Sequence, residues 1–248
     1  MRPISLVDIW SLNGATQHFS DCYLISSVSA LSRCKNGKRI IRQNIMRNGE
    51  NYLVRFNNVN GSFERYLVKS EDYNKCVRDP NAFTYLPIIQ VIEAAMGKLI
   101  NVHPNKKTFI SRLFDIYKMR YLRKFEANKP SRFMEMFTGV KPIILNEQGL
   151  KMSLKKYKNE AIALFNAMGE HKDNCCFIFG TGYKRKCKFS NFHCYEFVNA
   201  SPETKTIELT EHNSNKKIIL TYEEAIKNFK YICGYFDGML ASKSEVLK

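Results

Sequence analysis

The sequence predicts an α+β protein with two lobes, a mainly helical lobe over residues 1–138 and a β-rich antiparallel lobe over residues 139–248. In the first half, apolar residues recur every three or four positions, which is the period of a helix buried on one face. In the second half, short runs rich in β-branched and aromatic residues alternate with polar turns, which is typical of antiparallel strands. The change falls within "FTGVKP", residues 137–142, where glycine and proline interrupt the pattern.

Two helices and a hairpin are predicted in the first half. The segment 21–33 carries apolar residues at helical spacing, and Ser20 or Asp21 precedes it as a candidate N-cap. The segment 84–100, "TYLPIIQVIEAAMGKLI", predicts a second long helix with a proline near its start. Between them, residues 51–69 predict two strands joined through "NNVNGS", because Asn-Gly favours a tight hairpin turn.

The second half predicts an antiparallel sheet followed by a short helix. The helix begins at "TYEEAIKNF", where Thr221 and Glu224 have the spacing of a capping box. The expected strands are 174–182, 193–200, 206–213 and 216–221.

Composition restricts the class of protein. Hydrophobic residues make up 44% of the 248 positions and charged residues 25%, as in ordinary globular proteins. No apolar run reaches the roughly 18 residues needed to span a bilayer, and the first residues do not resemble a secretory signal. We therefore expect a cytoplasmic protein, or one secreted without a signal peptide into a host cell cytosol. The eight cysteines lack regular spacing and Cys-x-x-Cys pairs, so we expect reduced thiols rather than disulfides or a zinc site.

The chain is strongly basic, with 39 Lys and Arg against 23 Asp and Glu and a net charge of +16. Such a charge favours an anionic partner or a membrane surface. Nucleic acid is not expected, because no recognised nucleic-acid-binding motif accompanies the charge. We expect a monomer. The basic clusters are 35–47, 117–125, 151–158 and 183–188.

Cys22 is the strongest candidate for a chemically reactive residue. It stands where a loop turns into an apolar helix, and the positive end of the helix dipole favours a thiolate. A lone cysteine is otherwise a small buried apolar residue, a disulfide partner or a metal ligand. As a nucleophile it needs a histidine as base and a polar group that orients the imidazole.

A histidine with such a partner is predicted on the sheet. If the strands that begin at His193 and end at Asn213 pair with their apolar faces matched, these two residues lie opposite each other, with Cβ atoms ~5 Å apart. His212 then points to the other face. A shift of register would make Glu211 or Asn215 the orienting group instead.

The segment around Cys22 resembles the active site of the calpain-type cysteine proteases, Gly-Asp-Cys-Trp or Tyr followed by an apolar helix. The resemblance implies a two-lobed papain-like fold, Cys22 as nucleophile, His193 as base and Asn213 as orienting residue. It also implies a thiol peptidase that acts on protein substrates. The calcium dependence of animal calpains is not expected to carry over, because the sequence shows no convincing acidic loop, so we expect no cofactor or metal. The other similar segments, in family order, are "YLPIIQVIEAAMGKL", "RFMEMFTGV", "FHCYEFVNA" and "EHNSNKKIILTYEEAIKNF".

The sequence departs from that family at several positions. The family's oxyanion-hole glutamine lies six residues before the cysteine, where this chain has Thr16, so Gln17 is the candidate donor. Ser20 replaces a glycine, and no Pro-Trp follows Asn213. The same triad also serves deamidation, deubiquitination and acyl transfer, and a non-catalytic basic binding protein on this scaffold is the other alternative. A compact and strongly basic chain of this kind is typical of a secreted effector that acts in a host cell.

Overall fold

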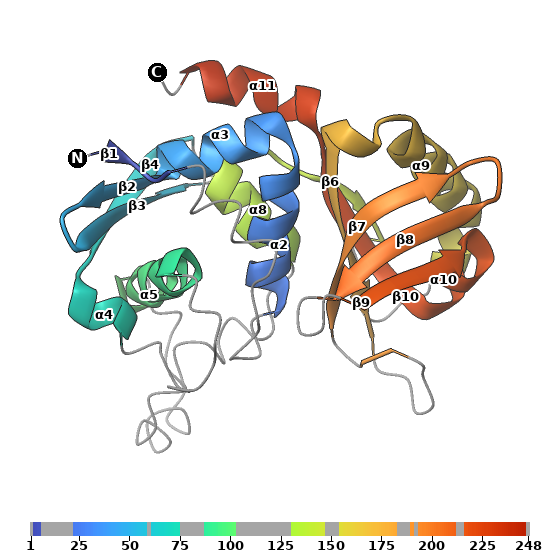
Figure 1. Ribbon diagram of the computed structural model, residues 1–248, viewed down its shortest axis with the longest axis horizontal. Coiled ribbons are helices and arrows are strands. Elements are labelled where there is room, and N and C mark those ends of the chain that lie inside the picture. Colours follow the sequence, from blue (N-terminus) through green and yellow to red (C-terminus); the bar gives the residue numbers. More distant parts are fainter. Residues whose placement is uncertain are drawn as a thin grey trace.

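The computed structural model describes residues 2–5, 22–58, 61–74, 87–102, 130–146, 154–182, 189–190, 193–211 and 216–246. Within these ranges the chain forms two antiparallel sheets, with helices between and around them (Figure 1). The predicted α+β class is confirmed. No helix in the described ranges is long and apolar enough to cross a membrane.

The first sheet has four strands in the order β1-β2-β3-β4. The predicted hairpin is confirmed, and at its turn Asn58 N donates to Ser62 O at 2.8 Å while Gly61 takes a φ of 81°, which suits glycine. The sheet is larger than the predicted hairpin, because two short polar segments, which have little strand signal, pair beside it. The strands are β1 (Arg2–Pro3), β2 (Ile45–Asn48), β3 (Asn51–Asn57) and β4 (Phe63–Val68).

Helices pack on and beside the first sheet. The two predicted helices are confirmed as α2 (Cys22–Arg33) and α5 (Pro87–Val102), and the N-cap candidates of α2 lie outside the described residues. The remaining helices of this part are α3 (Lys35–Asn44), α4 (Ser70–Asn74) and α8 (Pro130–Thr138).

The second sheet has six strands in the order β5-β10-β6-β7-β8-β9, and every neighbouring pair is antiparallel. The four predicted strands are confirmed as β6 to β9. The strands are β5 (Ile143–Leu145), β6 (Cys175–Thr181), β7 (Cys194–Ser201), β8 (Thr206–Glu211), β9 (Lys216–Thr221) and β10 (Phe229–Phe236).

Helices also follow the strands of the second sheet. The predicted capping box opens α10 (Tyr222–Asn228): Thr221 Oγ1 accepts from Glu224 N at 3.2 Å, and Glu224 Oε2 accepts from Thr221 N at 2.9 Å. The other elements are the 3-10 turns η3 (Leu154–Tyr157) and η4 (Lys172–Asn174), and the helices α9 (Lys158–Glu170) and α11 (Asp237–Val246).

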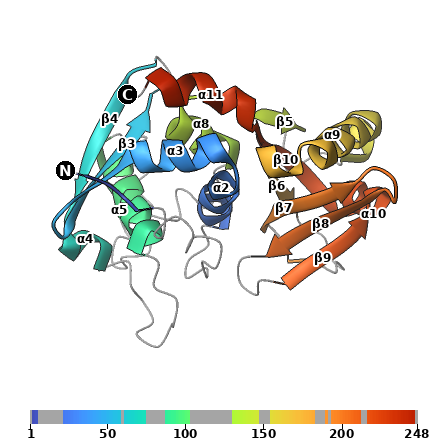
Figure 2. The same cartoon turned by 45° about the horizontal axis from the view of Figure 1, so that its top comes forward.

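The two faces of the second sheet take part in different cores. One face packs with α9 and α10 around a cluster that includes Phe165, Phe179 and Phe229. The other face joins the core of the first half, where Ile178 and Cys233 lie in the same cluster as the residues of α2. Figure 2 shows α2 in the middle of the molecule, with the first sheet on one side and the second on the other.

The C-terminal helix crosses the predicted boundary between the two lobes. After β10, α11 returns to the first half, where Asn36 N donates to Asp237 Oδ1 at 2.8 Å and the two chain ends lie on the same side (Figure 1). The boundary near 138 falls between the end of α8 and the start of β5. The division into lobes at that boundary stays a prediction.

Candidate functional site

The candidate site lies where the N-terminus of α2 approaches the start of β7. Cys22 is the first residue of α2, so its backbone N–H belongs to the unpaired first turn of that helix. The side chain of Cys22 lies outside the described part of the chain. Gln17 and Asn213 lie outside it entirely, so their predicted roles stay predictions.

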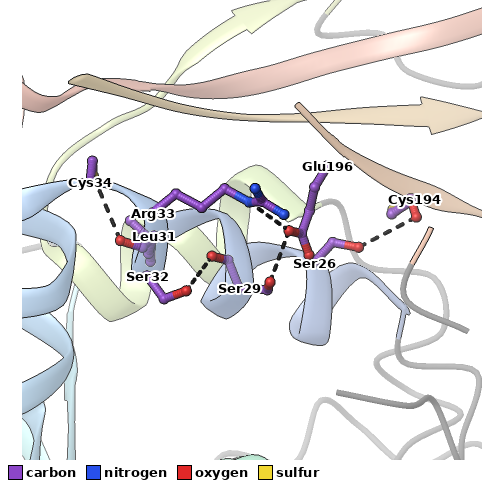
Figure 3. A network of polar contacts seen from close by, with 8 residues as sticks. All are labelled: Ser26, Ser29, Leu31, Ser32, Arg33, Cys34, Cys194 and Glu196. Carbon is purple, nitrogen blue, oxygen red and sulfur yellow. Dashed lines mark hydrogen bonds and ion pairs between the residues drawn. The ribbon is translucent and has the colours of Figure 1, made fainter. Parts of the chain in front are cut away.

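Three polar contacts attach α2 to β7 (Figure 3). Ser26 Oγ lies 3.4 Å from the carbonyl oxygen of Cys194. Ser29 Oγ donates to Glu196 Oε2 at 2.8 Å, and Arg33 Nε donates to the same oxygen at 3.1 Å. Ser26, Ser29 and Arg33 are spaced three and four residues apart, so they share one face of the helix. Later residues of α2 contact later residues of β7, so the helix and the strand run in the same general direction.

Glu196 is the buried centre of this contact, with 0% of its surface exposed. An ionised carboxylate in such a position requires charge-assisted hydrogen bonds, which Ser29 and Arg33 provide. The sequence analysis missed this network. A signal was present: a glutamate interrupts the apolar run of β7, and α2 combines small serines with a C-terminal arginine.

His193 directly precedes β7 and is anchored through its backbone. Its N–H donates to Thr181 Oγ1 at 2.9 Å, and its carbonyl accepts from Thr181 N at 2.9 Å. The imidazole packs edge-on against Tyr195, with ring centroids 5.1 Å apart. The residue is 7% exposed, so the ring is buried within the fold.

The described partner of the His193 imidazole is Glu211, the last residue of β8. Its Oε1 lies 3.4 Å from His193 Nε2, although no hydrogen bond with good geometry reaches that nitrogen within the described ranges. Sequence analysis gave Asn213 as the orienting residue and Glu211 as an alternative. In the structure Glu211 contacts the ring, and Asn213 lies outside the described residues.

The register of β7 and β8 is described from Glu196 onward. Glu196 pairs with Thr210 and Phe197 with Leu209, and the register shifts by one residue between Phe197 and Asn199. Asn213 lies outside the described residues, so its pairing with His193 stays a prediction.

The described cysteines other than Cys22 are poor nucleophiles. Cys34, Cys175, Cys176, Cys194 and Cys233 all carry buried, reduced thiols. Burial raises the pKa of Cys233 to about 12, and burial together with nearby acidic groups raises the pKa of Cys175 to about 12. The thiols of Cys175 and Cys233 therefore stay protonated at neutral pH and act in packing.

No described set of side chains is arranged as a metal site, since no three His, Cys, Asp or Glu residues come together within the ranges given above. His171 ends α9 on the surface, with its ring against Phe236, and the remaining histidines lie outside the described residues. His193 is thus the one described histidine that a carboxylate contacts in the interior.

No protein-family model matches this chain, and no curated protein matches its sequence.

Proposed function

We propose that this protein is a thiol peptidase with a papain-like fold, similar to calpain catalytic domains. In this proposal Cys22 is the nucleophile, His193 the general base and acid, Asn213 the orienting residue and Gln17 a donor to the oxyanion. The observation that carries the proposal is the contact between Ser26 and the carbonyl of Cys194. It lies one helical turn from the proposed nucleophile and one residue from the proposed base.

The geometry of helix and strand supports this pairing. One turn back from Ser26 toward Cys22 is a rise of about 6 Å along α2. One residue back from Cys194 along the strand, a step of about 3.3 Å, is His193. Because α2 and β7 run in the same direction, both steps lead from the Ser26 contact toward the same end of the two elements. The N-terminus of α2 and His193 therefore lie at that end.

The proposed reaction proceeds through a thioester. The Cys22 thiolate attacks the carbonyl carbon of a peptide bond, and the helix N–H groups and the Gln17 amide stabilise the oxyanion. The imidazolium of His193 then gives its proton to the leaving amine, and the C–N bond breaks. Water, deprotonated by the neutral imidazole, attacks the thioester, which releases the acid and restores the thiolate.

Glu211 adds a feature to this mechanism. A carboxylate 3.4 Å from Nε2 stabilises the imidazolium that forms during the reaction, and it leaves Nδ1 as the nitrogen available to the thiol. Asn213 would contribute the neutral hydrogen bond that fixes the plane of the ring. The two groups differ in charge, so replacing each in turn separates their contributions.

The test is labelling of the native protein with a peptidyl epoxide, followed by analysis of products. We expect one label per chain, lost in Cys22→Ala and retained in Cys175→Ala, because Cys175 is buried with a raised pKa. Incubation of cell lysates should then generate new protein N-termini with the wild type and none with Cys22→Ala or His193→Ala.

The other outcomes are equally informative. A mass increase of about one dalton on glutamine, or a new cross-link, would assign the same thioester to deamidation or acyl transfer and overturn the peptidase assignment. Equal reactivity of Cys22 and the buried cysteines toward the probe would show that the chain is not a thiol enzyme and would favour a binding protein.

A further inference from the structure

A buried arginine in the first sheet has no acidic partner in the described part of the chain. Arg55 lies on β3 and is 9% exposed. Its Nε and Nη2 atoms are buried and make no hydrogen bond there. Directly across on β4 is a second guanidinium, that of the exposed Arg65. Both guanidinium carbons lie over the ring of Phe63, at 4.9 Å and 4.8 Å from its centroid.

This arrangement is unfavourable in the isolated protein. Like charges at directly opposed positions of a sheet repel each other, and burial removes the water that would stabilise the Arg55 cation. The pKa of Arg55 is lowered, first by burial and then by the charge of Arg65. The contact with Phe63 offsets part of this penalty, since a cation over an aromatic ring gains about 0.5–2 kcal/mol. A negative charge brought from outside would offset the rest.

Apolar side chains flank the charge. Phe63 and Leu67 are 45% and 47% exposed, and with Arg65 between them they occupy every second position on one face of β4. That face therefore presents apolar, cationic and apolar groups in a row about 13 Å long by strand geometry. β3 and β4 lie at the opposite side of the molecule from the second sheet (Figure 2), so the row is distant from the start of β7.

We propose that the face of β4 formed by Phe63, Arg65 and Leu67, with Arg55 beside it, is a docking surface for an extended acidic protein segment. A carboxylate of the segment pairs with the exposed Arg65 guanidinium and offsets the charge of the buried Arg55 beside it, and the apolar side chains of the segment contact Leu67 and the exposed part of Phe63. The complementary pattern alternates an apolar residue and a glutamate or aspartate at every second position.

Two observations favour docking on this face over other modes of binding. Addition of a strand along the outer edge of β4 is obstructed, because the Leu67 carbonyl already accepts from Lys98 Nζ at 2.7 Å, and Lys98 is held by Asp72 at 2.6 Å. Stacking of a nucleic-acid base is disfavoured, because two guanidinium groups already lie over the Phe63 ring. A peptide laid across this face needs neither the strand edge nor a free face of the Phe63 ring, because its apolar side chains can contact Leu67 and the exposed part of Phe63.

The docking surface does not rest on the proposed peptidase activity. Its test uses the full chain carrying Cys22→Ala, so that a probe is not cleaved. The probe is a fluorescein-labelled peptide of the repeat Leu-Ser-Glu-Ser, and binding is followed by fluorescence anisotropy at 50 mM and 200 mM salt. We expect affinity to fall with salt, as for a charge-driven contact.

Substitutions identify the residues involved. We expect Arg65→Glu to weaken binding at least tenfold and Phe63→Ser to weaken it several-fold. Lys156→Glu makes the same change of charge on the exposed turn η3 and should leave affinity within twofold. A peptide with glutamine in place of glutamate should not bind. Equal losses for Arg65→Glu and Lys156→Glu, or tighter binding of a single-stranded oligonucleotide through the same residues, would overturn the proposal.

A measurement without peptide tests the premise. If Arg55 is an unpaired buried cation, Arg55→Met removes a penalty and should not lower the urea midpoint of unfolding. A marked fall in that midpoint would show that Arg55 serves the fold itself, and it would overturn the docking surface even if the peptide binds elsewhere.

Discussion

Replacing Glu196 with alanine should weaken the attachment of α2 to the second sheet. The carboxylate is fully buried and accepts hydrogen bonds from Ser29 and Arg33, at 2.8 Å and 3.1 Å. Both donors belong to α2, while Glu196 belongs to β7. The substitution therefore removes a long-range contact without touching the backbone of the helix.

The expected loss of stability follows from these contacts. A hydrogen bond to a charged group contributes about 1.5–3 kcal/mol, and a buried donor left without its acceptor costs about 1–3 kcal/mol. The Arg33 side chain is 30% exposed, so water replaces part of what it loses. The carboxylate also no longer has to be desolvated, which reduces the net effect. We expect the free energy of unfolding to fall by about 3 kcal/mol, or about 6–12 °C in Tm for a chain of this size.

Urea unfolding followed by circular dichroism measures this change, with Glu208→Ala as a matched control. Glu208 lies on the neighbouring strand β8 and pairs at 2.9 Å with Lys217, whose side chain is 73% exposed. Glu208 is 20% exposed, but water reaches the Lys217 end of the pair and screens it, so we expect the pair to contribute less than about 1 kcal/mol. If the two variants lose the same free energy within about 0.5 kcal/mol, the Glu196 contact does not hold α2 in place and the reasoning fails.

Four further predictions address other parts of the structure. If His193 activates Cys22 as proposed, Glu211→Gln should slow alkylation of Cys22 by iodoacetamide about tenfold at pH 6, because the carboxylate 3.4 Å from Nε2 is removed; an unchanged rate would exclude that role. Thr221→Ala should lower the free energy of unfolding by about 1 kcal/mol in urea, since α10 loses its N-cap. Gly234→Ala should cost about 3 kcal/mol and reduce soluble yield, because its Cβ would lie 2.1 Å from a carbonyl oxygen of β6; a normally stable variant would contradict this. The pKa of Cys233 is raised to about 12 in the folded state, against about 8.5 when unfolded, so this thiol's contribution to stability is complete below pH ~8.5 and is lost as pH rises toward 12. The share of Cys233 in the loss of unfolding free energy between pH 8 and pH 10 is about 2 kcal/mol, so Cys233→Ala should reduce that loss by this amount; an unchanged loss would contradict this.

Local patterns were sufficient to predict much of the fold. The helices α2 and α5 were predictable because their apolar residues repeat at the helical period and face a core. The capping box of α10 was predictable because Thr221 and Glu224 satisfy backbone groups only three residues apart. These features depend on interactions between near neighbours in the sequence.

Contacts between distant segments were harder to predict. β1 and β2 are too short to show a strand pattern, and each is held by pairing with its neighbour, β1 with β2 and β2 with β3. The bond between Ser29 and Glu196 joins residues 167 positions apart, and no local period reveals it. Glu211 was among the sequence-based alternatives, but its contact with His193 depends on how a long side chain turns at the end of β8.

The composition of α2 now has a physical explanation. Its serines are small enough to let the helix pack between two sheets, and Ser26, Ser27 and Ser29 are each no more than 1% exposed. Two of them face β7, so the helix is fixed both in position along the strand and in rotation about its own axis. If Cys22 is the nucleophile, its distance from His193 is set by the same contacts. The proposed site is therefore preorganised by the packing of α2, and we expect it to need no large closure of the lobes before it reacts.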